Sequence, residues 1–454
     1  MNEQPTHGSN GRGPAALVIG GGIAGIQASL DIAEAGFRVH LVERSPSIGG
    51  RMSQLDKTFP TLDCSSCILT PKMVDAGRHP NIDLYTYSEV VQVTGEAGDF
   101  HARIRVKPRY IDPEKCHGCG LCAEACRLAG RISSDFNAGM GKRAAVYVPF
   151  PQAVPLVYTV DPEACVYLTR GVCGKTFKCK DACTAGAIDF DQKEVFVDVD
   201  AATIINATGF DVFDPNLRPE LGYGVYPHVI TSLEFERLAS ASGPTAGKIT
   251  LDGTLPKKLV FIQCVGSRDR SLNLPYCSRV CCMAVAKQAH LAHDRIPGAE
   301  ITVFYIDIRA FGKGFEEFYD RVRHEGVLYR RGNPSEVLRR GDRLVVRAED
   351  TLLGEPVEVE ADLVVLAVGI RPRADAQSVA EMLGLALDEN GFFQEAHPKV
   401  GIVESNRPGV LLAGCCQGPK DIPDTVAHAK AAASAALIQM AQTQKVMATA
   451  HAAN

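Results

Sequence analysis

Residues Ala16–Gly50 read ALVIGGGIAGIQASLDIAEAGFRVHLVERSPSIGG, and this stretch decides how the chain folds. An apolar strand runs into Gly20-x-Gly22-x-x-Gly25, a helical pattern follows, and a second apolar strand ends at Glu43. Gly20 permits a tight turn, Gly22 lets a pyrophosphate approach the backbone, and Gly25 lets the helix pack closely on the strand. The stretch therefore predicts a complete βαβ unit that binds a dinucleotide.

The kind of nucleotide is indicated by the residues that follow the glycine loop. The helix N-terminus would face the phosphates, and Glu43 would accept hydrogen bonds from the ribose hydroxyls. The next glycines, Gly49-Gly50-Arg51, resemble the second glycine pair of FAD-binding reductases. We therefore expect FAD rather than NAD; the alternative is a glycine-rich turn that binds no ligand.

Length and composition are those of an ordinary globular protein. The chain has 454 residues, is 46% hydrophobic and carries a net charge of −5, so no overall basic field points to nucleic acid or to an anionic membrane. No apolar run reaches the roughly 18 residues that span a bilayer, and residues 1–14 are polar without a signal-peptide core. We expect a cytoplasmic protein with a disordered N-terminal tail. The 16 cysteines are clustered, which indicates metal ligation rather than disulfides.

Two later segments supply further flavin-binding features. Residues 203–209, TIINATG, form an apolar strand ending in an Ala-Thr-Gly turn that is common in flavin reductases of the thioredoxin reductase type. A second strand, 409–414, ends in glycine, and Asp424-Thr425 would start and cap a helix over 426–440 whose N-terminus points at the flavin. The expected FAD-binding residues are Gly20, Gly22, Gly25, Glu43, Gly50, Arg51, Gly209, Gly414, Asp424 and Thr425.

Residues 256–372 have the layout of an NAD-type domain, with strands at 259–264, 301–306 and 363–368, a helix at 282–293 and charged hairpins at 332–359. The expected fold class is α/β, with two Rossmann-like nucleotide-binding domains of thioredoxin reductase type and an inserted two-cluster ferredoxin-like domain. The expected division is a tail (1–14), an FAD-binding domain in three parts (15–108, 197–255 with a linker, and 373–440), the insert (109–196), the NAD-domain-like unit (256–372) and a C-terminal tail (441–454).

The insert carries eight cysteines in two groups. The first group, Cys116-x2-Cys119-x2-Cys122-x3-Cys126, has the bacterial ferredoxin spacing, in which three thiolates bind one cluster and the fourth binds the other. The second group is Cys165-x7-Cys173-x5-Cys179-x3-Cys183. The predicted ligand sets are Cys116, Cys119, Cys122 and Cys183 for one 4Fe–4S cluster, and Cys126, Cys165, Cys173 and Cys179 for the other.

The insert departs from the ferredoxin pattern at two points. Arg127 and Thr184 stand where that pattern has proline, and the second group has stretched spacing. Zinc is the alternative metal, although zinc ribbons favour two separated Cys-x2-Cys knuckles rather than a triple run.

A third group, Cys264-x12-Cys277-x3-Cys281-Cys282, lies between the first strand and the helix of the NAD-like unit. An NAD-binding loop would carry a glycine fingerprint here, but only Gly266 precedes the helix. Four thiolates at a helix entrance would obstruct a pyrophosphate and could hold an iron–sulfur cluster. Buried structural cysteines are the alternative.

Four cysteines remain. Cys64 and Cys67 form a CxxC pair, which could be a redox dithiol near the flavin, packing residues, or ligands to a cluster at a subunit contact. Cys415 and Cys416 stand where related reductases usually have Gly-Asp, and we expect them to pack against FAD or a neighbouring subunit. His117 has no second histidine at metal-binding spacing.

Four features together resemble the A-type, iron–sulfur flavoprotein subunit of heterodisulfide reductase: DCSSCILTPKMVDAGRHPNI, the inserted ferredoxin-like cysteines, CVGSRD with YCSRVCC, and GPKDIPDTVAHAKAAA. The resemblance covers about residues 15–440 and implies FAD and several 4Fe–4S clusters, with Cys264, Cys277, Cys281 and Cys282 as ligands of a third one. It also implies that the chain acts inside a complex whose other subunits serve as electron donor and acceptor. Some members of the family carry out flavin-based electron bifurcation. A homodimer is a second arrangement that we consider. Compared with the long archaeal members, the sequence lacks an N-terminal domain and a C-terminal ferredoxin domain, so we expect a short form.

The combination of cofactors favours an electron-transfer role. A flavin exchanges two electrons together or singly, whereas each cluster carries one, so a chain with both converts two-electron into one-electron chemistry. The leading hypothesis is an oxidoreductase subunit of this kind. One alternative is an NAD(P)H-dependent flavin disulfide reductase that uses Cys64 and Cys67, against which the missing second glycine loop counts. Another is a non-catalytic assembly subunit.

Overall fold

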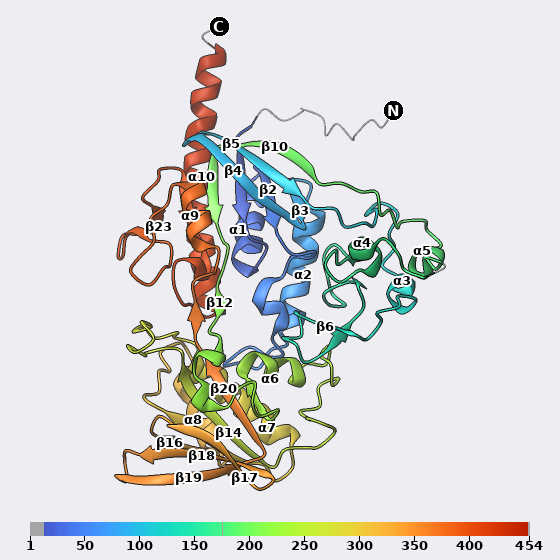
Figure 1. The fold of residues 1–454 in the computed structure, drawn as a ribbon. Coiled ribbons are helices and arrows are strands. Elements are labelled where there is room, and N and C mark those ends of the chain that lie inside the picture. The colour runs from blue at the N-terminus through green and yellow to red at the C-terminus, as the bar shows by residue number, and fades with distance from the viewer. Residues whose placement is uncertain (1–12, 175, 453–454) are drawn as a thin grey trace.

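The structure, a computed structural model, describes residues 13–174 and 176–452. Figure 1 shows two α/β units stacked end to end, with a loop-rich segment that projects from the side of the first. Residues 1–12, which make up nearly all of the expected N-terminal tail, lie outside the described part of the chain.

The first unit is built on a seven-stranded sheet with the strand order β22-β23-β24-β11-β1-β2-β3. Strand β1 lies inside the sheet, parallel to the central strand β11 on one side and to β2 on the other, so the glycine loop leaves from the interior of the sheet. The bounds are β1 (Ala15–Ile19), β2 (Arg38–Glu43), β3 (Ile82–Thr86), β11 (Thr203–Asn206), β22 (Glu395–His397), β23 (Gly401–Ser405) and β24 (Val410–Leu412).

Helices cover one face of this sheet and a second, smaller sheet covers the other. The helices are α1 (Ile23–Glu34), α2 (Ser65–Arg78) and α10 (Ile422–Ala452), and α1 packs along α10 through apolar residues such as Ile26, Leu30 and Ala433. The opposite face packs on an antiparallel sheet of β4 (Ser88–Glu96), β5 (Asp99–Val106) and β10 (Val195–Ala201), with α9 (Ala376–Leu383) beside it.

The second unit repeats this plan with a five-stranded parallel sheet in the order β13-β20-β14-β15-β16. Three helices pack on one face and an antiparallel sheet packs on the other. The strands are β13 (Val229–Thr231), β14 (Lys258–Val265), β15 (Glu300–Tyr305), β16 (Leu328–Arg331) and β20 (Leu363–Val368); the covering elements are α6 (Ser232–Ala239), α7 (Cys281–Arg295), α8 (Phe315–His324), β17 (Glu336–Arg340), β18 (Arg343–Asp350) and β19 (Glu355–Ala361). The predicted α/β class with two Rossmann-like units is confirmed.

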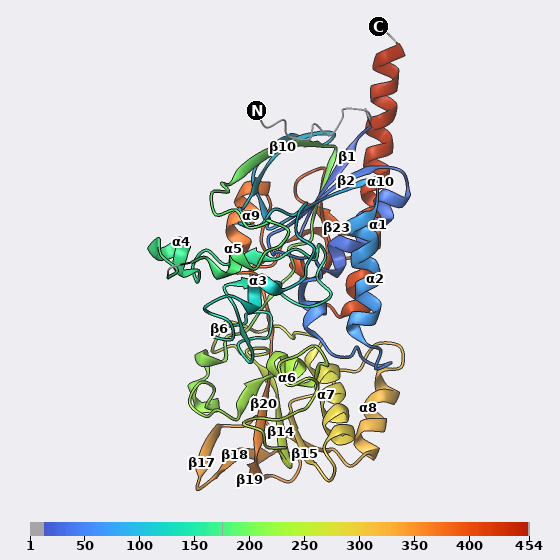
Figure 2. The same cartoon turned by 90° about the vertical axis from the view of Figure 1, so that its right-hand side faces the viewer.

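The inserted segment consists of short elements, as expected for a cysteine-rich unit with a small core. It contains α3 (Leu121–Glu124), α4 (Val166–Arg170), α5 (Lys178–Asp181) and two hairpins, β6 (Ile132–Ser133) with β7 (Lys142–Arg143) and β8 (Val146–Tyr147) with β9 (Thr159–Val160). Arg109 anchors it to the first unit, because its buried guanidinium donates to the carbonyl of Pro46 at 2.9 Å and to Thr159 Oγ1 at 2.9 Å. Figure 2 shows α4 at the outermost end of the segment.

The structure differs from the sequence-based expectations at three places. Strand β13 and helix α6 join the second unit, although 197–255 was expected to continue the first, because β13 pairs with β20. Helix α10 begins at Ile422 rather than 426, and the Asp421 carboxylate accepts the Asp424 N–H at 2.8 Å, so Asp421 supplies the N-terminal cap. The same helix continues through the expected C-terminal tail to Ala452.

A short strand pair connects the two units, in which β12 (Asp211–Val212) pairs with β21 (Ile370–Arg371). In the chain, β12 is followed by the short helices η2 (Pro215–Leu217) and η3 (Pro219–Leu221).

Candidate flavin and iron–sulfur sites

The glycine loop after β1 is shaped by two glycines and left open at a third. A Cβ on Gly20, where φ is +111°, would lie 2.3 Å from the Ala207 carbonyl oxygen, and a Cβ on Gly25 would lie 1.8 Å from the Gly20 oxygen. A Cβ on Gly22 would meet nothing closer than Gly50 Cα, at 3.9 Å. Packing therefore requires Gly20 and Gly25, whereas the space beside Gly22 fits the approach of a pyrophosphate.

Glu43 lies at the end of β2, where an acid that binds ribose is expected. Its carboxylate also accepts the Gly21 N–H at 2.7 Å and the Ser45 N–H at 2.7 Å, with one bond to each oxygen. Each oxygen keeps a second lone pair for a ligand hydroxyl. Glu43 thus holds the glycine loop in shape, a role that the sequence pattern does not reveal.

The second glycine pair faces the first loop. Gly50 has a φ of +54°, and a Cβ there would lie 2.8 Å from Gly22 Cα. The next residue, Arg51, lies in the short helix η1 (Gly50–Gln54) and donates to Gln54 Oε1 at 3.2 Å and to Asp211 Oδ1 at 3.4 Å. Burial lowers the pKa of the Arg51 guanidinium, which stays a cation at any physiological pH.

The remaining residues that we expect to bind FAD lie at strand ends beside α10. Together with the glycine loop, Glu43, Gly50 and Arg51, they form what we call the expected flavin cradle. Gly209, with φ at +78°, has open space around its Cα, whereas a Cβ on Gly414 would lie 2.8 Å from Ala24 Cβ. The Gly414 N–H donates to His428 Nδ1 at 3.0 Å, and the other ring nitrogen of His428 donates to the Ile402 carbonyl at 2.9 Å. These two bonds require neutral imidazole, and burial lowers the His428 pKa accordingly.

Asp424 and Thr425 lie in the first turn of α10, just after the capping residue Asp421. The Thr425 N–H donates to the Asp421 carbonyl at 2.9 Å, and the buried Thr425 hydroxyl lies 3.7 Å from Cys415 Sγ. Both residues therefore stand at the helix end that the sequence assigns to the flavin, where the helix dipole favours negative charge.

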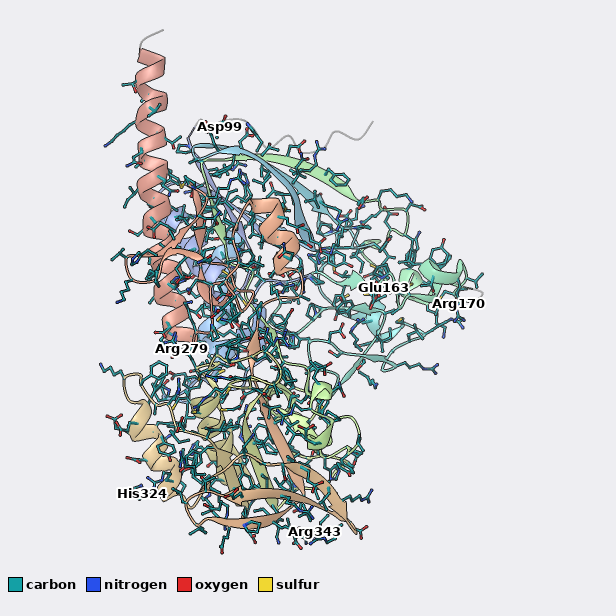
Figure 3. All side chains as sticks on the ribbon, turned by 60° about the vertical axis from the view of Figure 1, so that its left-hand side comes forward. Asp99, Glu163, Arg170, Arg279, His324 and Arg343 are labelled. Atoms are coloured by element: carbon teal, nitrogen blue, oxygen red, sulfur yellow. The ribbon has the colours of Figure 1, made fainter. Side chains whose placement is uncertain are left out.

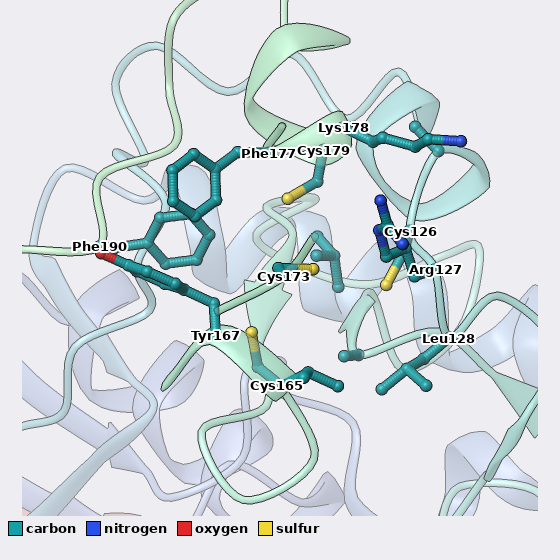
Figure 4. Close-up of a pocket in the computed structure, with 14 residues that line it drawn as sticks. Cys126, Arg127, Leu128, Cys165, Tyr167, Cys173, Phe177, Lys178, Cys179 and Phe190 are labelled. Carbon is teal, nitrogen blue, oxygen red and sulfur yellow. The ribbon is translucent and has the colours of Figure 1, made fainter. Parts of the chain in front are cut away.

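The two cysteine groups of the insert exchange one member each, as the ferredoxin spacing predicts. Four sulfurs from α4, α5 and the neighbouring loops point into a common space in Figure 4, and they belong to Cys126, Cys165, Cys173 and Cys179. The remaining insert thiols, Cys116, Cys119 and Cys183, surround Cys122. Burial and these neighbours raise the pKa of the Cys122 thiol to about 12. Burial and the other thiols of its own set raise the pKa of Cys179 to about 11.

These sulfur sets are wider than a site for one ion. Among the described residues, no three Cys, His, Asp or Glu side chains converge closely enough to hold a single metal ion. A 4Fe–4S cube takes a wider set, because each of its four thiolates binds a different iron. The all-thiol donor sets fit such cubes in their chemistry and in their number of ligands.

The third cysteine group also gathers in space, at the start of α7. Cys264, Cys277 and Cys282 surround the buried Cys281, and burial raises the pKa of Cys264 to about 12. The loop between them is fixed to the strand β21, because Ser278 Oγ accepts the Ile370 N–H at 2.8 Å and the Tyr276 hydroxyl donates to the Ile370 carbonyl at 3.0 Å.

Arg279 connects this loop to the expected flavin helix, and sequence reasoning missed it. Its guanidinium donates to Asp424 Oδ2 at 2.8 Å and to the Pro419 carbonyl at 3.2 Å, and it lies 5.1 Å above the ring of Phe311. In Figure 3 Arg279 lies at the junction of the two units. Arg279 and Asp424 are 145 positions apart, and no local pattern signals such a contact.

A buried ion pair within the second unit also bonds to the backbone of the first unit, and the sequence analysis missed it as well. Lys287 Nζ donates to Glu236 Oε1 at 2.5 Å and to the Lys57 carbonyl at 2.9 Å, and both charged side chains are almost completely buried. Gln288 Nε2 and the Asp56 N–H also donate to Glu236. A charged residue within the buried face of α7 was the available signal.

Cys64 and Cys67 lie at the start of α2, where the Cys67 N–H donates to Cys64 Sγ at 3.3 Å. The hydrogen bond to Cys64 raises the pKa of the exposed Cys67 thiol. An activated nucleophile of the dithiol type needs a lowered pKa. The geometry therefore pairs the two thiols but does not activate Cys67.

Cys415 and Cys416 form the short helix η4 (Gly414–Cys416) and are buried inside this chain. The Cys416 thiol donates to the Asn206 carbonyl at 3.1 Å, and the Cys415 thiol donates to the Lys420 carbonyl at 3.4 Å. Burial raises the pKa of Cys416 to about 12. Both are thiols held by backbone oxygens beside the expected flavin cradle.

Family comparisons agree with this division of the chain. The FAD dependent oxidoreductase family matches residues 16–108, and the 4Fe-4S binding domain family matches residues 109–127. Among solved structures, thioredoxin reductase of Lactococcus lactis has a TM-score of 0.52 at 14% identity, over 94% of this chain and 99% of that one. Thioredoxin reductase of T. acidophilum has a TM-score of 0.51 at 14% identity, over 94% and 96%. The fold and the sites define an FAD-dependent oxidoreductase with an inserted 4Fe–4S domain.

Curated proteins of similar sequence indicate the family that this chain resembles. The chain is 52% identical over 429 residues to the A-type subunit of H(2):CoB-CoM heterodisulfide,ferredoxin reductase from Methanothermobacter marburgensis, a match that covers 94% of this chain and 64% of that one. It is 46% identical to the A-type subunit of ferredoxin:CoB-CoM heterodisulfide reductase from Methanosarcina mazei, over 92% of this chain and 52% of that one. The chain resembles this family of A-type heterodisulfide reductase subunits over nearly all of its own length and spans less than two-thirds of the length of these relatives. None of the helices in the described part of the chain combines the length and the apolarity that a membrane span needs.

Proposed function

We propose that this chain is the FAD- and iron–sulfur-carrying electron-transfer subunit of a heterodisulfide-reductase-like complex, with two clusters in the insert and a third at Cys264, Cys277, Cys281 and Cys282. The observation that carries the proposal is the contact between Arg279 and Asp424. This contact joins the loop of the third cysteine group to the first turn of α10, the expected flavin helix. The cysteine group therefore lies next to the residues expected to bind FAD, in a loop where an NAD-binding domain would hold a pyrophosphate.

The protein's own groups fit this role. When bound, FAD supplies two-electron chemistry and each cluster supplies a one-electron step. The N-terminus of α10 favours negative charge at the flavin edge, and neutral His428 holds Gly414 in place beside it. The thiols of Cys415 and Cys416 remain protonated because burial raises their pKa values, so they add no negative charge there.

Partners follow from the same proposal. Other subunits of the complex would supply the electron donor and acceptor, and flavin-based bifurcation would be a property of that whole complex. The names of the relatives pair a heterodisulfide with ferredoxin. A cytoplasmic location and a homodimer stay predictions from the sequence. The disulfide reductase alternative is not favoured, because the relatives are heterodisulfide reductase subunits and Cys67 is not activated.

The test is an anaerobic reductive titration of the purified, FAD-loaded chain, followed by absorbance and by electron paramagnetic resonance. We expect FAD and the clusters to share electrons within one chain, with no steady-state oxidation of NADH or NADPH. Steady NAD(P)H oxidation that is lost in Cys64→Ser would support the disulfide reductase instead. Flavin reduction without any cluster signal would contradict the proposal.

A further inference from the structure

Gln263 is a buried polar residue near the end of an otherwise apolar stretch of strand. Its strand, β14, reads KLVFIQCV, and the Gln263 side chain is 2% exposed. A side-chain amide carries two N–H donors and one acceptor oxygen, and burial is costly unless these groups find partners. The partners of this amide therefore indicate what Gln263 does.

A β-bulge turns the end of β14 toward the third cysteine group. The pairing of β14 with β20 shifts its register between Ile262 and Val265, and Cys264 lies in the left-handed region with φ at +62°. Neighbouring residues of a regular strand point to opposite faces, and a bulge changes the direction of one of them. The bulge thus lets two consecutive residues, Gln263 and Cys264, both lie beside Cys282.

The Gln263 amide is hydrogen-bonded at one end only. Cys282 Sγ lies 3.5 Å from Gln263 Oε1, and the thiol donates to this oxygen. The buried Gln263 Nε2 has no hydrogen-bond partner among the residues that the structure describes. The same thiol lies 3.5 Å from the Asp307 carbonyl oxygen as well. Two oxygens therefore share a single S–H, while the amide nitrogen lacks an acceptor.

A metal-bound Cys282 would reverse this balance. A cysteine binds a metal as a thiolate, which has no proton and only accepts hydrogen bonds. The terminal torsion of a glutamine side chain is broad and roughly two-fold, so the Gln263 amide can turn over without movement of the strand. The turn exchanges Oε1 and Nε2, which places an N–H on the sulfur and gives the buried nitrogen its missing acceptor.

The other donors near this sulfur differ from Gln263. Arg268, the cation beside Cys264, already donates to Asp307 Oδ2 at 2.7 Å. The backbone N–H of Arg309 favours negative charge on Cys282, but a substitution cannot remove it. Gln263 supplies its N–H from a side chain, so its contribution can be measured separately.

We propose that Gln263 is a positioning residue of the third cluster, which donates its amide N–H to Cys282 Sγ and thereby raises the reduction potential of that cluster. Hydrogen bonds to a ligand sulfur stabilise the reduced, more negative cluster. The proton stays on the amide nitrogen in both oxidation states, so no proton is transferred through this contact. The inference rests on the proposed function, since it requires a cluster at Cys264, Cys277, Cys281 and Cys282.

The test compares the midpoint potential of this cluster in the complete chain, loaded with FAD and clusters, for the wild type and for Gln263→Met. Methionine is unbranched like glutamine and has no N–H donor. A redox titration followed by electron paramagnetic resonance gives the potential, and the signal of the third cluster is the one that disappears in Cys277→Ser. We expect reduction of this cluster to become about tenfold less favourable, which lowers its midpoint potential by about 59 mV for a one-electron couple. The potentials of the insert clusters should not change.

Gln288→Met is the matched control. Gln288 is 1% exposed on α7, and its Nε2 donates to the Ser232 carbonyl at 3.1 Å and to Glu236 Oε1 at 2.6 Å. The control removes a buried amide from the same unit and should leave the potential of the third cluster at its wild-type value. An unchanged potential in Gln263→Met with full iron content, or an equal shift in both variants, would overturn the role of Gln263.

A measurement on the wild type does not depend on how the variants fold. With nitrogen-15 in the side-chain amides of glutamine, the electron spin echo modulation of the reduced third cluster should show a nitrogen-15 coupling from Gln263 Nε2. Absence of that coupling while the cluster signal is present would overturn the role of Gln263 alone. Full retention of iron in Cys277→Ser would overturn the proposed third cluster, and the role of Gln263 with it.

Discussion

The Arg279 guanidinium donates to the Asp424 carboxylate at 2.8 Å, across the junction of the two nucleotide-binding-type units. In an NAD-binding reductase the corresponding strand-to-helix loop cradles a pyrophosphate. Here the Cys277 sulfur accepts the Arg279 N–H at 3.3 Å, and the loop reaches the first turn of α10 through the Arg279 side chain. The second unit therefore keeps the Rossmann-like scaffold, while its strand-to-helix loop carries cysteines and contacts α10.

Arg279→Gln should separate these two sites functionally with little effect on stability. Both side chains of the pair are partly exposed, so we expect a loss of about 0–1 kcal/mol in the free energy of unfolding. Electron exchange between FAD and the third cluster should slow, because the loop is no longer fixed against α10. Stopped-flow reduction followed at flavin and cluster wavelengths checks this. Equal rates in the variant would show that the loop is held by Ser278 and Tyr276 alone.

Gly22→Ala and Gly25→Ala form a matched pair that separates binding from folding. A methyl on Gly25 would overlap the Gly20 carbonyl, so that variant should lose about 1–3 kcal/mol of stability or more. A methyl on Gly22, where φ is −76°, meets open space, so its fold should remain within about 1 kcal/mol of the wild type. FAD affinity of Gly22→Ala should nevertheless fall at least about tenfold, because the methyl occupies the phosphate position. Thermal melts of the apoprotein and fluorescence titration with FAD give both quantities; normal FAD affinity would contradict the assigned phosphate position.

The buried pair of Lys287 and Glu236 should be costly to break on one side. Lys287→Met leaves the Glu236 carboxylate buried without its cation, which typically costs about 3–5 kcal/mol. Removing both charges in Lys287→Met/Glu236→Leu should cost less than the single change, because no uncompensated charge remains. Urea unfolding of the wild type, of both single variants and of the double variant measures this. Purely additive losses would mean that the two side chains do not interact.

Acid should destabilise the flavin cradle through His428. Its pKa is lowered in the folded chain from an ordinary value of 6.5, so below that pH the unfolded chain binds a proton that the folded chain excludes. Stability should therefore fall as the pH drops through about 6.5 and continue to fall until the folded histidine itself titrates. His428→Gln, whose amide can make similar bonds, should flatten this part of the pH profile. Denaturation midpoints from pH 8 to 5 test it, and an identical slope in both proteins would assign the effect to other groups.

Sequence reasoning recovered the elements whose signal is local. The strand predicted at 363–368 has those bounds in the structure, and the helix predicted at 282–293 spans Cys281–Arg295. Glycine and cysteine spacings were equally informative, because a tight turn or a cluster loop is set by neighbours in the chain. The cap of α10 was misplaced by one turn, since Asp421 and Asp424 are both acceptable caps and only the path of the preceding loop decides between them.

Long-range contacts were not predictable. Arg279 meets Asp424, Lys287 meets Glu236, and β13 joins the second sheet through residues far apart in the chain. These partners are decided by tertiary packing, within the second unit for the last two and between the units for Arg279, and no periodicity or motif records that packing.

The measurement that tests the central claim most directly is iron, acid-labile sulfide and FAD per chain, on protein purified without oxygen, for the wild type and for Cys277→Ser. With three 4Fe–4S clusters and one flavin, we predict about twelve irons, about twelve sulfides and one FAD, with a loss of about four irons in the variant. About eight irons in both proteins, or zinc in place of iron, would contradict the third cluster and would leave Cys264, Cys277, Cys281 and Cys282 as buried structural thiols.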